Sequence, residues 1–172
     1  MKSKNYNCIF ATNSLNISSD GNERAIAFIE GGPGAPEVGG MVIFFNVPDG
    51  LEIFAEVYGL EQYQPAIDEN TPFGFHIHEI GDCTIGDESA PFTTAGEHWN
   101  PTNEPHGSHA GDLPVLISSN GFARMSFFTN KFNVSDVVGK SVIIHQDPDD
   151  YRTQPAGASG KRIACGVVKL VI

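Results

Sequence analysis

Cysteine is scarce in this chain, with three among 172 residues, which excludes a small scaffold held together by many disulfides. Cys83 and Cys165 lie in different sequence contexts, so a pairing through the fold stays open, and so does the redox compartment. Long hydrophobic runs are missing too. No run approaches the roughly 18 apolar residues of a membrane-spanning helix, and the opening residues hold only one short apolar stretch, Cys8 to Ala11. We therefore expect no signal peptide and no membrane partner. The expected location is cytoplasmic, with attachment to a cell or spore surface as the alternative.

Positive charge is missing from most of the chain. No Lys or Arg lies between Arg24 and Arg124, a stretch that carries 15 of the 21 carboxylates, and the formal net charge is −11. A chain with this balance repels polyanions such as nucleic acid and anionic lipid surfaces. Both are excluded as partners.

Apolar and turn-forming residues, by contrast, are plentiful. Hydrophobic residues make up 40% of the chain and include 12 Phe, enough for a real core and against intrinsic disorder. Gly and Pro together number 30 (19 plus 11), which suits a fold with many turns better than one of long helices. We expect an all-β fold in one domain over residues 23–172, preceded by a polar N-terminal tail over residues 1–22.

Short β-rich runs alternate with turn clusters along this domain, a pattern typical of a sandwich or a barrel. Two turn clusters, Pro48-Asp49-Gly50 and Ser119-Asn120-Gly121, predict hairpins between neighbouring runs. Long irregular stretches over 80–112 and 147–163 are where function is expected, because long loops in compact domains usually carry it. The predicted strands are eight: 25–31, 41–47, 51–58, 73–79, 113–118, 122–129, 140–146 and 164–171.

Histidines are the chemical signal of the sequence, because all six fall within 76–145. His76 and His78 lie two apart on a predicted strand, so both imidazoles point to the same face and can bind one ion. The others are His98, His106, His109 and His145, with Asp112 three residues after His109.

A bland interpretation exists for each of these residues. A single strand histidine such as His145 is more often a structural side chain than a ligand. The combination favours metal, since imidazole-rich sites with few thiolates bind copper, zinc, iron or nickel rather than calcium or magnesium. Ligands that outnumber one tetrahedral shell suggest two ions.

Five segments together resemble copper/zinc superoxide dismutase, in a bacterial-like form with a short zinc loop. They are GFHIHEIGDC (74–83), AGEHWNPTNEPHG (95–107), HAGDLP (109–114), IIHQDPDD (143–150) and GKRIACGVV (160–168). The resemblance covers about residues 25–172. It implies an eight-stranded Greek-key barrel, with two metals outside the barrel wall under two long functional loops.

The resemblance also implies the ligands and cofactors. Copper would be bound by His76, His78, His98 and His145. Zinc would be bound by His98, His106, His109 and Asp112, so that His98 bridges the two ions. Asp149 would link a copper ligand to a zinc ligand.

Other residues receive roles on the same basis. Arg162 would receive the substrate anion superoxide, and His98 would carry a proton between the two half-reactions that give dioxygen and hydrogen peroxide. Cys83 and Cys165 match the disulfide of the family, whereas Cys8 has no counterpart.

The chain departs from better-known members in two places. The step from His106 to His109 is only three residues, and the loop over 147–163 is short and has no lysine cluster. Only Arg152, Lys161 and Arg162 are left to attract an anion against the net charge, so we expect a slower enzyme whose rate depends steeply on ionic strength. Monomer and homodimer both stay open.

Two other functions compete with the enzyme. A non-catalytic metal-binding or structural relative would keep the fold without dismutating superoxide, although all four copper positions are filled by His. A cupin-like oxygenase built on His76 and His78 explains neither Arg162 nor the two cysteines, and ranks last.

Overall fold

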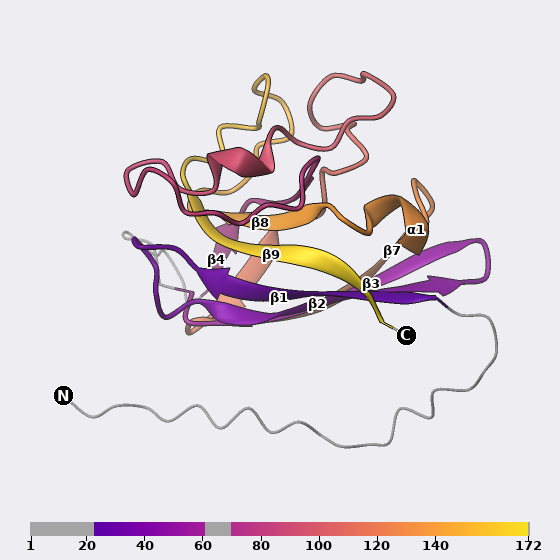
Figure 1. The fold of residues 1–172 in the computed structure, drawn as a ribbon, viewed down its shortest axis with the longest axis horizontal. Helices are drawn as coiled ribbons and strands as arrows, with labels where there is room; N and C mark the ends of the chain where they lie inside the picture. Colours follow the sequence, from indigo (N-terminus) through magenta and orange to yellow (C-terminus); the bar gives the residue numbers. More distant parts are fainter. Residues whose placement is uncertain (1–22, 61–69, 172) are drawn as a thin grey trace, which may run out of the picture.

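The computed structural model describes residues 23–60 and 70–171. The predicted N-terminal tail over residues 1–22 lies outside them. The described residues form nine antiparallel strands and two short helical turns (Figure 1). The strands are β1 (Arg24–Gly31), β2 (Gly39–Val47), β3 (Gly50–Tyr58), β4 (Asn70–Phe73), β5 (Phe75–His78), β6 (Leu116–Ser119), β7 (Phe122–Thr129), β8 (Ser141–His145) and β9 (Arg162–Val171), with η1 (Thr93–Ala95) and α1 (Val134–Val137) between them.

All nine strands belong to one sheet, in the order β4-β6-β7-β3-β2-β1-β9-β8-β5. Side chains of β3 alternate between buried and half-buried positions, so one face of the strand fills the interior. Both predicted hairpins are confirmed. Asp49 precedes Gly50 with a φ of 69° between β2 and β3, and Asn120 and Gly121 have φ of 52° and 82° between β6 and β7.

The predicted strand 73–79 is two strands, which makes nine where eight were expected. The break is at Gly74, whose N–H donates to the Asp147 carbonyl at 2.8 Å and whose carbonyl accepts from the His145 N–H at 2.8 Å. β4 on one side of Gly74 pairs with β6, whereas β5 on the other side pairs with β8. Because these two edge strands are consecutive in the chain, the sheet curls into a nearly closed all-β barrel, as predicted.

One predicted boundary moves by three residues, since the run 113–118 becomes a strand only at Leu116. The N–H of Leu113 donates to the Phe75 carbonyl and the N–H of Val115 to the Tyr151 hydroxyl, while Pro114 has no N–H. The N–H groups of Leu113 and Val115 are therefore not available to pair with the neighbouring strand, and β6 begins only after them. The helix α1 was not predicted, because a four-residue helix is too short to show a helical period.

The barrel interior is apolar, and its largest fully buried side chains include Phe44, Phe75, Leu51 and Ile53. The two predicted irregular stretches are confirmed as loops that rise together on one side of the barrel, above β8 and β9 (Figure 1). These loops and the strands beneath them hold the histidines.

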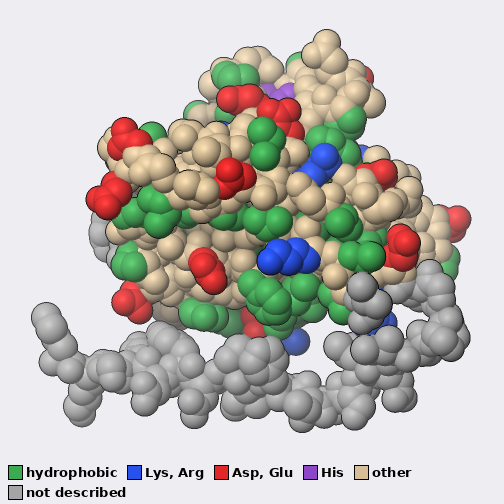
Figure 2. Space-filling model, in the orientation of Figure 1, with side chains coloured by type: hydrophobic (Ala, Val, Ile, Leu, Met, Phe, Trp, Pro, Cys, Tyr) green, Lys and Arg blue, Asp and Glu red, His purple; other side chains and the backbone are tan. Residues whose placement is uncertain are grey.

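Acidic side chains are spread over the face seen in Figure 2, while a small area of histidine surface shows between the loops. No helix within 23–60 and 70–171 has the length and apolar character needed to cross a bilayer.

Candidate metal centre

Strand β5 carries the first two histidines on its outer face. Phe75 and Ile77 point into the barrel core, so the alternation of the strand turns His76 and His78 the other way, under the loops. β8 pairs with β5 and ends at His145. The exposed fractions of the three histidines are 0, 0 and 4%, so all are shielded from solvent.

The loop after β5 is bound to that strand by main-chain hydrogen bonds. The Trp99 N–H donates to the Ile77 carbonyl at 2.8 Å, and the Ile77 N–H donates to the Gly111 carbonyl at 2.9 Å. A Cβ on Gly111 would lie 2.3 Å from the Ile77 oxygen, so only glycine allows this approach. The same loop forms single β-bridges with β5, which pair His78 with His98 and His76 with Asp112.

Two groups of potential ligands result, and they share one residue. We call His76, His78, His98 and His145 the four-histidine cluster, and His98, His106, His109 and Asp112 the mixed cluster. In each cluster, one ligand atom per residue lies within 4.8 Å of all the others, and every residue is buried. His98 belongs to both clusters and joins them.

The four-histidine cluster is arranged for a cation. Nδ1 of His78 lies 2.9 Å from the Gly96 carbonyl oxygen, and Nδ1 of His145 lies 3.4 Å from the Gly160 carbonyl oxygen. Since a carbonyl oxygen can only accept, Nδ1 carries the proton in both rings. The two Nε2 atoms, which are 3.4 Å apart, then carry no proton when the rings are neutral, so their lone pairs repel each other. A cation between them removes that repulsion, as imidazole-bound copper would.

Buried ring nitrogens without a hydrogen-bond partner point to the same conclusion. Such atoms are costly unless something satisfies them. Within the described residues they are His76 Nδ1, His98 Nε2, His106 Nδ1 and His109 Nδ1, all from the two clusters. The donor sets fit the ions expected from the sequence, since four imidazoles suit copper and three imidazoles with one carboxylate suit tetrahedral zinc.

Asp149 links a histidine of the four-histidine cluster to one of the mixed cluster, as the family resemblance implied. Its Oδ2 accepts from His76 Nε2 and its Oδ1 from His106 Nε2, both at 2.8 Å. Burial alone would raise the pKa of this carboxyl, but the hydrogen bonds from His76 and His106 outweigh that effect and lower the pKa to about 2. Asp149 therefore stays ionised and holds both rings by the nitrogens that face away from the clusters.

Burial also controls the charge of the histidines. It lowers the pKa of His76 to about 4, against the hydrogen bond that His76 donates to Asp149, and it lowers the pKa of His78 and His145 well below the usual value. These rings are neutral near pH 7. Their lone pairs are available to an ion without prior loss of a proton.

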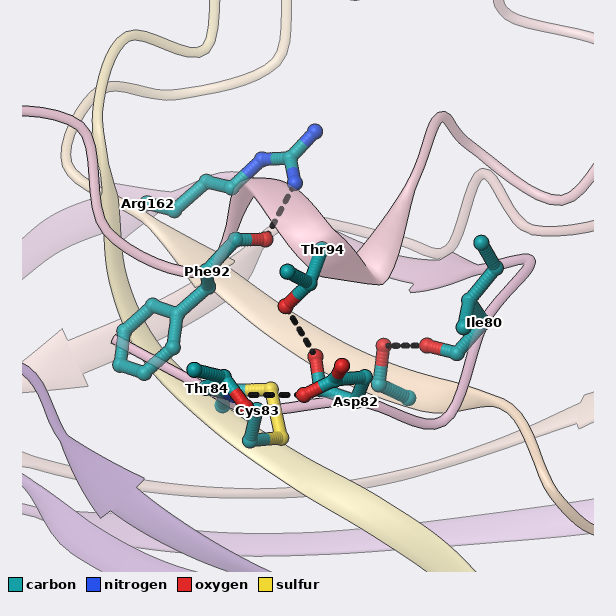
Figure 3. Close-up of a disulfide and its surroundings, with 9 residues drawn as sticks. Ile80, Asp82, Cys83, Thr84, Phe92, Thr94 and Arg162 are labelled. Atoms are coloured by element: carbon teal, nitrogen blue, oxygen red, sulfur yellow. Dashed lines mark hydrogen bonds between the residues drawn. A yellow bond between two sulfur atoms is a disulfide. The ribbon is translucent and has the colours of Figure 1, made fainter. Parts of the chain in front are cut away.

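Arg162 lies at the start of β9, and two of its guanidinium N–H groups bind the loop that carries η1. They donate to the Phe92 and Gly96 carbonyls at 2.6 Å each, and Figure 3 shows the Phe92 contact beside the disulfide. Gly96 O also accepts from His78, so one carbonyl joins Arg162 to a residue of the four-histidine cluster.

The disulfide expected from the sequence is present between Cys83 and Cys165, with 5.7 Å between the Cα atoms. Cys165 packs with Phe92, Ala95 and Ile143 in a small buried apolar cluster outside the barrel core. The bond thus fastens the loop that contacts Arg162 to β9, the strand that carries Arg162 (Figure 3).

Sequence reasoning missed three residues of the loop over 147–163. A Cβ on Gly157 would lie 1.8 Å from Asp149 Oδ1, so the carboxylate position requires glycine there. Tyr151 and Gln154 hydrogen-bond to the loop that supplies the mixed cluster. Their residue types give no chemical signal in a loop, and only their place in a long irregular stretch pointed to them.

Comparisons with known proteins agree with this geometry. Residues 38–168 match the family model described as copper/zinc superoxide dismutase. A copper/zinc superoxide dismutase from Deinococcus radiodurans is 36% identical over 152 residues, which cover 78% of this chain and 79% of that protein.

Two solved structures are also similar. A copper/zinc superoxide dismutase from Brucella abortus matches with a TM-score of 0.70 and 26% identity, over 84% of this chain and 99% of that chain. A mutant of a superoxide dismutase-like protein from Bacillus subtilis matches with a TM-score of 0.66 and 31% identity, over 83% of this chain and 95% of that chain.

Proposed function

The chain belongs to the copper/zinc superoxide dismutase family, and we propose that it converts superoxide to dioxygen and hydrogen peroxide at the two joined clusters. One observation carries this conclusion. Both ligand sets are complete and buried, and they share His98. A cupin-like oxygenase fits neither the family nor the second cluster.

The four-histidine cluster would hold copper and the mixed cluster would hold zinc. Copper held there would supply the one-electron chemistry that oxidises one superoxide and reduces a second, and zinc, which has no redox change, would supply none. In sum, two superoxide ions and two protons yield one dioxygen and one hydrogen peroxide. The protein must therefore admit a small anion and deliver protons.

We assign proton delivery to His98. Its Nδ1 lies 2.9 Å from Asp112 Oδ1 in the mixed cluster, while its Nε2 is buried without a hydrogen-bond partner. Nε2 would take a proton from solvent in the first half-reaction and give it to the second superoxide as that is reduced to peroxide, while solvent supplies the second proton directly.

We assign recognition of the anion to Arg162. A guanidinium has five N–H donors, and the Phe92 and Gly96 carbonyls take two of them, which fixes its plane. The others can donate to superoxide beside His78, whose Nδ1 shares the Gly96 carbonyl.

The decisive experiment measures metal content and superoxide removal on the same purified sample. We expect one copper and one zinc per chain, and activity that is lost in His145→Ala, which removes a ligand of the four-histidine cluster only. Zinc without copper or activity would instead support a non-catalytic relative.

Superoxide is the substrate that the family implies. We propose that the protein acts as a monomer or a homodimer, and sedimentation of the metal-loaded chain distinguishes the two. The cytoplasmic location expected from the sequence stays a prediction.

A further inference from the structure

The segment that supplies the mixed cluster is short. Three of the four ligands lie within seven consecutive residues, from His106 to Asp112, and none of these residues belongs to a strand or helix. Such a segment has little regular structure of its own to hold three side chains in a tetrahedral arrangement. Asp112 Oδ2 accepts from the Gly107 and His109 N–H groups within the segment, and contacts with other parts of the molecule supply the rest of its order.

Tyr151 forms hydrogen bonds with the chain directly after the C-terminal end of this segment. Its hydroxyl accepts from the Val115 N–H at 2.7 Å and donates to the Leu113 carbonyl at 3.2 Å, directly after Asp112. The Tyr151 N–H donates to Asp149 Oδ1 at 2.7 Å, the same oxygen that accepts from His106. Tyr151 thus contacts both the chain that follows Asp112 and the Asp149 carboxylate, which accepts a hydrogen bond from His106.

The backbone of Tyr151 fits closely against the same segment. A Cβ on Gly107 would lie 2.4 Å from the Tyr151 carbonyl oxygen, so the two loops touch without room for a side chain. Tyr151 has a φ of 55°, a left-handed conformation that costs a non-glycine residue free energy unless its surroundings hold it. The hydrogen bonds of the Tyr151 hydroxyl and N–H stabilise this conformation.

Gln154 forms hydrogen bonds with the N-terminal end of the segment, at His106. Its side-chain Oε1 accepts from the His106 N–H at 2.8 Å, and its Nε2 donates to the His106 carbonyl at 3.3 Å. Nε2 also donates to the Arg152 carbonyl at 3.1 Å, which orients the amide within its own loop. Gln154 therefore pairs with the main chain of the first ligand on both sides, like a neighbouring strand.

We propose that Tyr151 and Gln154 are positioning residues that clamp the zinc-ligand segment at its two ends and hold it in its zinc-binding geometry. Neither side chain binds the metal. They act through the main chain of His106, Leu113 and Val115, and the proposal rests on the zinc site assigned above.

The test compares Tyr151→Phe with wild type, because this change removes the clamping hydroxyl and keeps the ring and the N–H contact to Asp149. Zinc affinity is measured by competition with a chelator. We expect a decrease of about 10-fold, at the low end of the 10–100-fold range for partners that orient metal ligands. Tyr58→Phe is the matched control, since Tyr58 is 37% exposed and Tyr151 40%, and Tyr58 lies on β3. Its zinc affinity should not change.

Two readouts separate positioning from a general loss of stability. A merely structural role would lower the melting temperature equally with and without zinc, whereas positioning reduces the rise in melting temperature that zinc causes. Cobalt(II) in the mixed cluster gives a visible absorption band that reports ligand geometry, and this band should change in Tyr151→Phe only.

Gln154→Leu tests the other end of the clamp and decides the question if Tyr151→Phe does not fold. Gln154 is exposed, so this variant should fold and lose zinc affinity by a similar factor. Zinc affinity within twofold of wild type in both variants would overturn the proposal. Neither readout uses turnover, so a wild-type protein that binds zinc but leaves superoxide unchanged would contradict the proposed function alone.

Discussion

Asp149 connects the two clusters through its two oxygens, one for His76 and one for His106. Each oxygen accepts from the ring nitrogen that faces away from the cluster, so the carboxylate fixes which nitrogen is free for the ion. At the scale of single residues, the centre therefore depends on the placement of protons as much as on the placement of ligands.

Asp149→Asn should weaken the binding of both metals. An amide has one oxygen acceptor and one N–H₂ donor, so either His76 or His106 would meet a donor with its own N–H. We expect metal affinity to fall by about 10-fold or more. Metal competition measures this, with Asp147→Asn, two residues away in the same loop, as the control. Unchanged affinity in Asp149→Asn would contradict the role given to this carboxylate.

The metal-free protein should lose stability in mild acid. Unfolded His76 takes up a proton near pH 6.5, whereas folded His76 does so only near pH 4, so the unfolded state binds more protons between these values. The free energy of unfolding then falls as pH drops from about 6.5 to 4, by roughly 3 kcal/mol for this residue. The buried neutral His78 and His145 act in the same direction. Denaturant unfolding across this range measures the effect, and a constant free energy would refute it.

Arg162→Gln should impair capture of the substrate without loss of metal. The charge that attracts superoxide disappears, while both ligand sets stay complete. We expect kcat/KM to fall by about 10-fold or more, with copper and zinc content unchanged. Pulse radiolysis and metal analysis of one sample provide both numbers. A normal rate would show that another group guides the anion.

Residue type and spacing predicted an imidazole-rich centre for two ions, because imidazoles and carboxylates are the groups that bind these ions, and the family resemblance implied which residues bind each ion. They could not predict Tyr151 or Gln154. These two act through hydrogen bonds to main-chain groups of a distant loop, and main-chain groups look alike at every position of a sequence.

At the scale of elements, hydrophobic alternation and turn residues predicted most strands and both tested hairpins. They did not predict the division of 73–79, because the pattern stays apolar through Gly74 while its hydrogen-bond partners change. Strand pairing joins distant segments, and a local pattern does not record it.

The disulfide is the covalent connection between the η1 loop and β9, and its removal should affect both stability and substrate capture. Cys83 and Cys165 are 82 residues apart, and closing a loop of that length stabilises the folded state by about 4.5 kcal/mol in the chain-entropy model. Cys83→Ser with Cys165→Ser should lower the free energy of unfolding by about this amount. It should also reduce kcat/KM, because the carbonyls that orient Arg162 lose their support.

Cys8→Ser is the matched control for that pair, since it removes a cysteine without touching the disulfide. Chemical unfolding of the three proteins gives the comparison. A double variant as stable and as active as Cys8→Ser would contradict this account.

At the scale of the whole molecule, charge works against the reaction, because a chain of net charge −11 must attract an anion. Lys131 Nζ donates to the His109 carbonyl at 3.1 Å, Lys161 precedes Arg162 in the chain, and Arg152 lies in the same loop as Asp149. Composition gave the sign of the global charge but could not say which charges lie within a Debye length of the site.

The rate should depend steeply on salt. Cations act on superoxide at distances between about 10 and 30 Å when the Debye length is about 30 Å, at 0.01 M salt, and are largely screened over those distances when it is about 10 Å, at 0.1 M. We therefore expect kcat/KM to fall as salt rises, and the slope to flatten in the double variant Arg152→Gln, Lys161→Gln. Lys169→Gln, on the exposed outer part of β9, should keep the wild-type slope. A rate that does not vary with salt would disprove steering by these residues.

Gly74 lies where the closing strands of the barrel meet the residues of the metal centre. The same residue divides the two edge strands, bonds to the main chain of His145 and bonds to Asp147 in the loop that carries Asp149. A chain that completes its barrel there has already brought β5, β8 and that loop into contact. Gly74 therefore couples closure of the barrel to the placement of the residues that form and support both clusters.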